Sequence, residues 1–335
     1  MSKPIFERKN ILVTGGAGFL GSHLCDRLVK EHKVICIDNF KTGNEDNINH
    51  LLKHPDFEFI KHDLIKSINL EELQELKVFK VAFQGLQEIY HLACPTSPAV
   101  YKKYPLETLL ANTHATRNAL DLAVKYRAKF ILFSSDAVYG QPTEDKPLPE
   151  NYWGYVDPIG PDSSFAEGKR AAESLVYHYR QVYNIDAKIV RIFPTYGPRL
   201  QLKDGRLIPE IIRQAITEST INLADSKDAR LSLSFFSDTL DAVDRMMNSN
   251  EHGPVNVGND SPTTIGEVAE LVKKLSEMKV NIKYNAGENK NIYRLPNIQF
   301  ARQRLGWFPV ISLAEGIRQT ISYLKATYIQ KHLST

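Results

Sequence analysis

The sequence predicts an α/β protein in which a doubly wound parallel sheet carries a smaller, mixed α/β lobe. Two observations lead to this fold class. Short apolar runs alternate with helical stretches up to about residue 192, and glycines join the first run to the first helix. Strands and helices in alternation are typical of a parallel sheet that helices cover on both faces.

Six apolar runs are the expected strands, and the segments between them show the apolar spacing of helices. The strands are ILVTG (11–15), KVICID (33–38), FEFIKHD (57–63), EIYHLAC (88–94), KFILFSS (129–135) and AKIVRIF (187–193). The helical stretches in this part are residues 19–32, 105–127 and 165–184. Beyond residue 193 we expect a loop at 196–207 and helices at 208–216, within 263–278 and at the end of 305–329.

These elements divide the chain into residues 1–192, the sheet domain, and residues 193–335, mainly the second lobe. The prediction leaves open whether part of residues 228–250 belongs to the sheet domain instead. There is no low-complexity linker in the sequence, so we expect the two parts to pack closely together.

Composition narrows the class of protein. The 335 residues are 42% hydrophobic and 24% charged with a net charge of +3, and lysine and arginine are scattered, so we expect no nucleic-acid partner. The start, MSKPIFERKN, lacks the apolar core of a signal peptide, and no apolar run approaches the ~18 residues of a membrane span. We therefore expect a cytoplasmic protein with no membrane partner. The three cysteines, Cys25, Cys36 and Cys94, have no CxxC spacing and are expected to be buried free thiols.

The stretch TGGAGFLG places three glycines between the first strand and the first helix. Gly15 permits a tight turn, Gly18 lets the backbone approach a pyrophosphate at the helix N-terminus, and Gly21 lets helix and strand pack closely. Asp38 ends the second strand, where a carboxylate accepts hydrogen bonds from the ribose diol of NAD and repels the 2′-phosphate of NADP. The pattern predicts a Rossmann domain that binds NAD.

With these features in place, the sequence resembles the extended short-chain dehydrogenase/reductases, the NAD-dependent nucleotide-sugar epimerase/dehydratase family. The motifs are TGGAGFLG, SSDAVYG (134–140) and a lysine four residues after an aromatic ring at 165–169. Within the family the likeness is closest to UDP-glucuronate decarboxylases, over about residues 9–325. Stretches such as HLACPTSP (91–98), RIFPTYGPRL (191–200) and LGWFPVISLAEGI (305–317) carry it.

The resemblance implies a tightly held NAD that oxidises C4 of a nucleotide-diphosphate sugar, with a UDP-sugar favoured. Decarboxylation, epimerisation and dehydration of the 4-keto intermediate all stay open, as does C4 oxidation alone. In the family a tyrosinate, a lysine and a Ser or Thr hydroxyl act on the C4 hydroxyl, and by position Ser135 is the hydroxyl and Lys169 the lysine. The implied cofactor contacts are Gly15, Gly18, Phe19, Leu20, Gly21, Asp38, Asn39, Asp63, Leu64, Leu92, Ala93 and Lys169.

The tyrosine position is occupied by Phe165, which has no hydroxyl. Either this is a deliberate Tyr-to-Phe change, or the natural protein has given up the usual chemistry. A catalytically silent nucleotide-sugar-binding protein is a separate alternative. Loss of a general base typically removes about 10²–10⁴ in rate. Tyr101 and Tyr139 are the candidates for a substitute base.

Two further departures concern the substrate. Ala137 stands where the decarboxylases have a glutamate, which favours an epimerase or dehydrogenase, and Pro194 stands where an asparagine contacts the nucleotide sugar. The expected substrate contacts are Thr96, Ser97, Tyr101, Ser135, Arg206 and Arg294.

Three further features of the sequence concern assembly, metal binding and the packing of tryptophans. The helices at 105–127 and 165–184 correspond to those that form a four-helix interface in the family, so we expect a homodimer. His50 and His54 have helical spacing but no third ligand nearby in sequence, so no metal is expected. Trp153 and Trp307 are expected to pack in the core or the second lobe.

Overall fold

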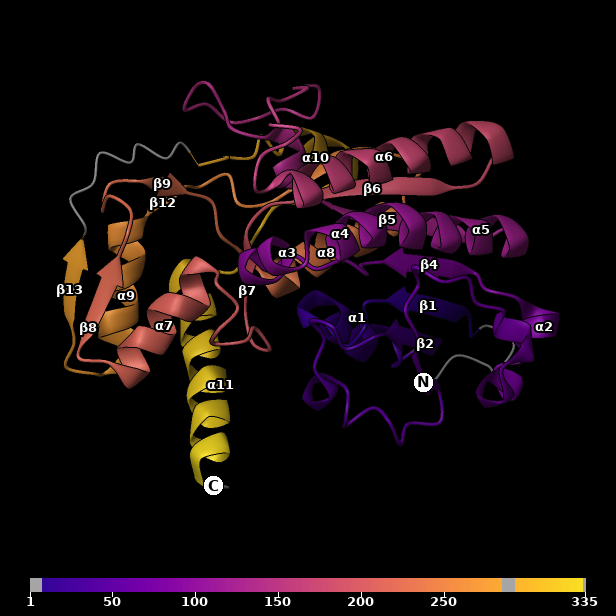
Figure 1. Ribbon diagram of the computed structural model, residues 1–335, viewed down its shortest axis with the longest axis horizontal. Helices are drawn as coiled ribbons and strands as arrows, with labels where there is room; N and C mark the ends of the chain where they lie inside the picture. The colour runs from indigo at the N-terminus through magenta and orange to yellow at the C-terminus, as the bar shows by residue number, and fades with distance from the viewer. Residues whose placement is uncertain (1–7, 285–292, 334–335) are drawn as a thin grey trace.

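The computed structural model describes residues 8–284 and 293–333, and its centre is a seven-stranded sheet (Figure 1). The strand order is β11-β6-β5-β4-β1-β2-β3, so the direction of winding reverses between β1 and β4. All pairings between these strands are parallel, which confirms the predicted fold class. The strands are β1 (Asn10–Thr14), β2 (Lys33–Asp38), β3 (Phe57–Lys61), β4 (Glu88–His91), β5 (Lys129–Ser135), β6 (Ala187–Ile192) and β11 (Val255–Val257).

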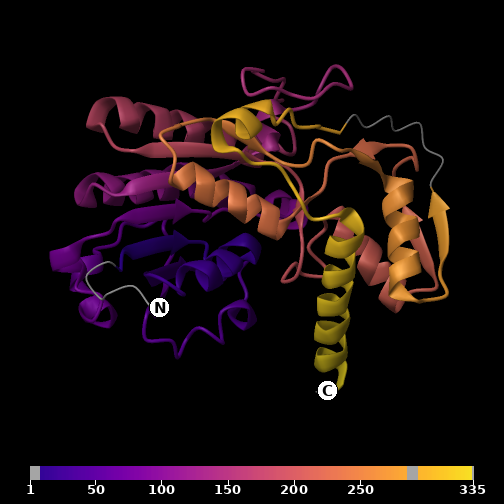
Figure 2. The same ribbon diagram turned by 180° about the vertical axis from the view of Figure 1, so that it is seen from behind.

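Helices cover both faces of the sheet, and successive strand residues supply the two cores in turn. Val13 of β1 belongs to the core on one face, and Leu12 to the core on the other. The first face is covered by α1 (Phe19–Leu28) and α8 (Phe236–Met247), seen in Figure 2, and the second by α5 (Thr116–Tyr126) and α6 (Ser163–Tyr183), seen in Figure 1.

The C-terminal half of the chain contributes to this sheet layer. Strand β11 pairs with β6, and α10 (Gln299–Leu305) and Trp307 belong to the same core cluster as α8. From the sequence, such a return is open only for part of residues 228–250. Strand β11 lies beyond that range and has three residues, too few for apolar periodicity to identify a strand.

The second lobe has its own apolar core. Helix α9 begins with a capping box, in which Thr264 and Glu267 bond each other's backbone, as expected for a helix start in this segment. The lobe contains α7 (Leu207–Thr217), α9 (Ile265–Ser276), α11 (Leu313–Leu333) and the strand pairs β7 (Thr195–Tyr196) with β10 (Ser234–Phe235), β8 (Thr220–Leu223) with β13 (Asn281–Tyr284), and β9 (Arg230–Leu231) with β12 (Thr263–Thr264).

The predicted helix at 105–127 is present but interrupted. It consists of α4 (Pro105–Leu110), a π-helical turn η5 (Ala111–Ala115) and α5. The π turn faces α6, where the backbone of Gly168 lies against Asn112. The shorter elements are η2 (Glu45–Asn47), η3 (Leu70–Glu72), η4 (Gln74–Lys77), α2 (Val81–Gln84), α3 (Pro98–Lys103) and η6 (Asp136–Tyr139).

The structure buries some but not all of the side chains that the sequence predicts to be buried. Trp307 is buried as predicted, but the prediction for Trp153 is wrong, because its side chain is 89% exposed on the loop before α6. All three cysteines are free thiols, and Cys25 and Cys36 are fully buried. Within the described ranges no helix is long and apolar enough to cross a membrane, and the cytoplasmic location stays a prediction.

Candidate active site

One cavity of about 1200 Å³ brings together the residues that the sequence analysis assigned to cofactor and substrate. It lies at the carboxyl ends of the strands, where the winding reverses between β1 and β4, the usual ligand position in such sheets. Its lining includes Gly15, Gly18, Phe19, Leu20, Gly21, Asp38, Asn39, Asp63, Leu64, Leu92, Ala93, Thr96, Ser97, Tyr101, Ser135, Phe165, Lys169, Arg206 and Arg294. The role of each residue stays a prediction.

The glycine loop has room for nothing larger than glycine at two positions. Gly15 has a φ of +73°, and a Cβ there would lie 2.9 Å from the backbone nitrogen of Ala93. A Cβ on Gly21 would lie 2.2 Å from the carbonyl oxygen of Gly15. The loop therefore lies tight against the start of α1 and leaves its backbone open to the cavity, a shape that fits a dinucleotide pyrophosphate.

Asp38 anchors this loop from the end of β2. Its carboxylate accepts hydrogen bonds from the backbone nitrogens of Ala17 at 3.0 Å and Phe40 at 2.8 Å. Burial raises the pKa of Asp38, and these backbone bonds oppose that shift. The carboxylate lines the cavity, as expected of a group that recognises a ribose diol.

Lys169 is buried on α6 beneath the cavity. Its Nζ donates to the carbonyl oxygen of Phe133 at 2.7 Å and lies 5.9 Å from the centroid of the Phe165 ring. Desolvation lowers the pKa of Lys169, while Cys94 and Glu173 oppose that shift. The sequence spacing of aromatic ring and lysine therefore brings the two side chains together at the cavity.

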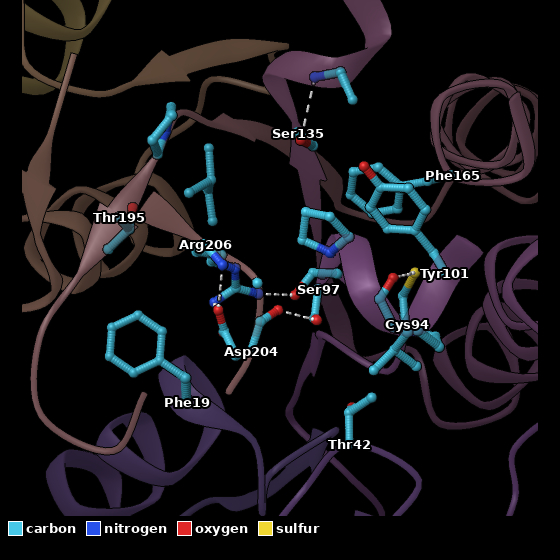
Figure 3. Close-up of a pocket in the computed structure, with 18 of the residues that line it drawn as sticks. Phe19, Thr42, Cys94, Ser97, Tyr101, Ser135, Phe165, Thr195, Asp204 and Arg206 are labelled. Atoms are coloured by element: carbon cyan, nitrogen blue, oxygen red, sulfur yellow. Dashed lines mark hydrogen bonds and ion pairs between the residues drawn. The ribbon is translucent and has the colours of Figure 1, made fainter. Parts of the chain in front are cut away.

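The two candidate substitute bases lie in different places. Tyr101 stacks on Phe165 inside the cavity, with ring centroids 5.1 Å apart and planes 4° from parallel (Figure 3). Burial, and then Asp162, raises the pKa of Tyr101 to about 12. Tyr139 instead donates to Asn256 at 2.6 Å in the protein interior and is absent from the cavity lining among the described residues. Tyr139 is therefore the wrong candidate, and Tyr101 stays protonated at neutral pH.

Ser135 lies at the end of β5 and belongs to a polar chain on the cavity wall. Its hydroxyl donates to Oδ1 of Asp136 at 2.9 Å. Oδ2 of Asp136 accepts from Nε of Arg294 at 2.6 Å, and Nη1 of Arg294 donates to the carbonyl of Gly140 at 3.1 Å. The predicted substrate arginine is thus held by a neighbouring carboxylate.

A second arginine lies at the other side of the cavity, near Thr195 (Figure 3). Arg206 donates from Nη2 to the hydroxyl of Thr96 at 2.5 Å and pairs through Nη1 with Asp204 at 3.2 Å. The Ser97 hydroxyl donates to the carbonyl oxygen of Asp204. These bonds join the loop after β4 to the loop before α7, so both walls of this part of the cavity are tied together.

Sequence reasoning missed the two acidic partners, Asp136 and Asp204. Asp136 pairs with Arg294, 158 positions away in the sequence, whereas Asp204 lies two residues before its partner Arg206, so only the second pairing has a local sequence signal. The histidines that were considered for a metal have other roles: His50 bonds Asp26 at 2.6 Å, and His54 accepts from the backbone of Asp56. Among the described residues no group of three or more His, Cys, Asp and Glu side chains could hold a metal ion.

Known protein families and solved structures resemble this chain in sequence and in fold. Residues 11–258 match the NAD dependent epimerase/dehydratase family. The chain belongs to this family. It is 39% identical over 319 residues to UDP-glucuronic acid decarboxylase 1 of Danio rerio, covering 95% of this chain and 73% of that protein. UDP-glucuronic acid decarboxylase 5 of Arabidopsis thaliana is 40% identical over 320 residues, covering 94% and 89%.

Solved structures of family members share the fold. The UDP-N-acetylglucosamine 4-epimerase of Methanobrevibacter ruminantium M1, in complex with UDP-N-acetylmuramic acid, aligns with a TM-score of 0.83 and 26% identity over 96% of this chain and 99% of that one. A UDP-glucuronic acid 4-epimerase of Bacillus cereus in complex with NAD aligns with a TM-score of 0.80 and 23% identity, over 96% and 98%. As an NAD-dependent family member, the chain has a glycine loop and an Asp38 that fit this cofactor.

Proposed function

We propose that this chain binds NAD and a nucleotide-diphosphate sugar, most readily a UDP-sugar, and oxidises the sugar at C4, as UDP-glucuronate decarboxylase-like enzymes do. The observation that carries the proposal is the single cavity in which the glycine loop, Ser135, Lys169 and two arginines meet. The likeness to UDP-glucuronic acid decarboxylases over most of the chain supports it.

Each residue has a distinct part in this proposal. NAD, when bound, accepts the hydride from C4. The buried Lys169 ammonium holds the nicotinamide ribose and adds positive charge beside the reacting hydroxyl, while the Ser135 hydroxyl hydrogen-bonds the C4 oxygen. Asp38 holds the adenosine ribose, and Arg206, which is 27% exposed in its side chain, faces the diphosphate.

The absence of a phenol hydroxyl at position 165 limits the rate of C4 oxidation. Phe165 fills the ring position but cannot accept the C4 hydroxyl proton, and Tyr101 has a pKa of about 12, so its hydroxyl is already protonated. We expect the chain as given to bind NAD and sugar and to turn over slowly.

Two alternatives follow from particular residues. Ala137 in place of a glutamate favours 4-epimerisation or simple C4 oxidation over decarboxylation, and 4,6-dehydration stays an alternative. Phe165 itself favours a catalytically silent nucleotide-sugar-binding protein. Turnover distinguishes the silent binder from the enzyme, and the product distinguishes the reactions.

The test compares the chain with Phe165→Tyr, each given NAD and a panel of UDP-sugars, with products identified by mass spectrometry. We expect the tyrosine variant to gain about a hundredfold or more in rate. Equal activity of the Phe form would show that another group takes the proton. Binding without turnover by both forms would favour the silent binder.

We also propose that the chain is a homodimer through α4, α5 and α6. Apolar side chains are exposed on the helices of this face, which supports burial against a second copy. Leu106 of α4 is 72% exposed, and Val182 of α6 is 70% exposed.

A further inference from the structure

Arg294 lies on the cavity wall beside Phe165, and its positive charge is balanced by a neighbouring carboxylate. Arg294 pairs through Nε with Asp136 at 2.6 Å, and Asp136 is only 7% exposed. The other oxygen of Asp136 accepts from Ser135, and Nη1 of Arg294 donates to the carbonyl of Gly140. Two of the three guanidinium nitrogens therefore already donate to acceptors of the protein.

This arrangement disfavours a carboxylate on the sugar. An arginine binds a carboxylate most strongly through two parallel N–H bonds. Arg294 cannot offer its Nε–Nη2 edge, because Nε is bonded to Asp136, and only the Nη1–Nη2 edge is left, with Nη1 shared with the carbonyl of Gly140. A substrate carboxylate at this wall would also meet the like charge of Asp136, which repels it in a partly desolvated cavity.

The neighbouring lining at this wall is mainly apolar, and the Lys169 ammonium, 5.9 Å from the centroid of the Phe165 ring, already donates to the carbonyl oxygen of Phe133. Ala137, Phe165 and Ala166 form a small buried apolar cluster, with Tyr101 packed against it. An uncharged hydroxymethyl group suits this wall, since its hydroxyl can donate to Asp136 and its carbon can contact the apolar cluster.

We propose that Asp136 is a specificity-determining residue: it neutralises Arg294, and the cavity therefore selects a UDP-sugar with an uncharged hydroxymethyl group at C6 over UDP-glucuronate. The inference rests on the proposed function, because it requires a nucleotide sugar in this cavity. It departs from the substrate named for the decarboxylase relatives, which are 39–40% identical to this chain.

Calorimetric titration of the NAD-loaded protein with UDP, UDP-glucose and UDP-glucuronate tests this inference without requiring turnover. The variants are Asp136→Asn, which keeps the shape and removes the charge, and Asp136→Ser, which frees Arg294. The matched control is Glu210→Gln, which removes another carboxylate of the same cavity, one that pairs with Arg213 at 2.6 Å.

We expect the unaltered chain to bind UDP-glucose about tenfold or more tightly than UDP-glucuronate. Both Asp136 variants should reduce this ratio by about tenfold, and Glu210→Gln should change it by less than about twofold. Unchanged affinity for UDP shows that each variant is folded.

Tighter binding of UDP-glucuronate by the unaltered chain would overturn the inference alone. So would an unchanged ratio in both Asp136 variants, or an equal change in Glu210→Gln. If none of the three nucleotides binds, the proposed function fails and this inference fails with it.

Discussion

At the scale of single residues, position 165 keeps the ring of the family tyrosine without its hydroxyl, so we expect the chain to bind its ligands and to turn over slowly. The ring is retained, stacked on Tyr101 and next to the Lys169 ammonium, so the cavity keeps its shape. What is absent is one oxygen atom. The hydroxyl, the lysine and the ring position could all be predicted from the sequence, because they lie in short motifs on a strand end and a helix.

His91 provides a residue-scale prediction about pH. Its ring lies between the hydroxyls of Thr14 at 2.8 Å and Thr116 at 3.1 Å, fully enclosed. Burial, and then the Lys169 ammonium, lowers the pKa of His91 from 6.5 to about 3. The unfolded chain therefore binds a proton below pH 6.5 that the folded chain does not, and stability is lost as the pH falls from 6.5 towards 3.

Because of His91, the free energy of unfolding is expected to fall by about 1.4 kcal/mol for each pH unit below 6.5. Urea unfolding at several pH values, for the chain and for His91→Gln, measures it. Because glutamine does not titrate, the difference in unfolding free energy between the two should shrink as the pH falls. A difference that is constant from pH 7 to 5 would show that His91 is protonated in the folded state.

Asp136 and Thr96, which bond the two predicted arginines, could not be identified from residues near those arginines in the sequence. Arg294 meets Asp136 and Arg206 meets Thr96 across more than a hundred residues of sequence. Such pairs depend on where loops from different strands come together, which apolar periodicity does not determine.

At the scale of elements, α6 contacts the π turn η5 next to Lys169, the lysine that we propose holds the nicotinamide ribose. Gly168 precedes Lys169, and a Cβ at Gly168 would lie 2.9 Å from Nδ2 and 3.0 Å from Cβ of Asn112. Asn112 is buried and donates to the carbonyl of Thr108, so it has little freedom to move away.

We therefore expect Gly168→Ala to lower the free energy of unfolding by about 1–2 kcal/mol, although alanine favours helices. Thermal or urea unfolding measures this loss. In an Asn112→Ala background the same substitution should be neutral or stabilising, since the opposing side chain is gone. Equal effects in both backgrounds would show that the contact is not the cause.

The long elements were predictable and the short ones were not. Strands β2 and β5 lie at the residues that their apolar runs predict, and α6 is within two residues of its predicted bounds. The three-residue β11 and the two-residue strands of the second lobe are too short for a periodic signal. The π turn interrupts a stretch that reads as one helix in the sequence.

At the scale of the whole molecule, the face formed by α4, α5 and α6 is the expected dimer interface. Leu106→Asp with Val182→Asp should convert a dimer to monomers, because two carboxylates would be buried in an apolar contact. Sedimentation measures the mass. The matched control is Phe83→Asp, because this residue is 94% exposed and lies on α2, outside the three helices of the proposed interface, and it should leave the dimer intact. A monomeric unaltered chain, or a dimer unaffected by the double substitution, would contradict the proposal.

The central claim is that the cavity oxidises C4 of a UDP-sugar, and an isotope measurement tests it most directly. Phe165→Tyr, loaded with NAD, is mixed in a single turnover with UDP-glucose or UDP-glucuronate carrying hydrogen or deuterium at C4, and NADH absorbance is followed. The account predicts that NADH forms and that deuterium slows its formation with at least one of the two sugars. Product formation with no NADH and no isotope effect would contradict it.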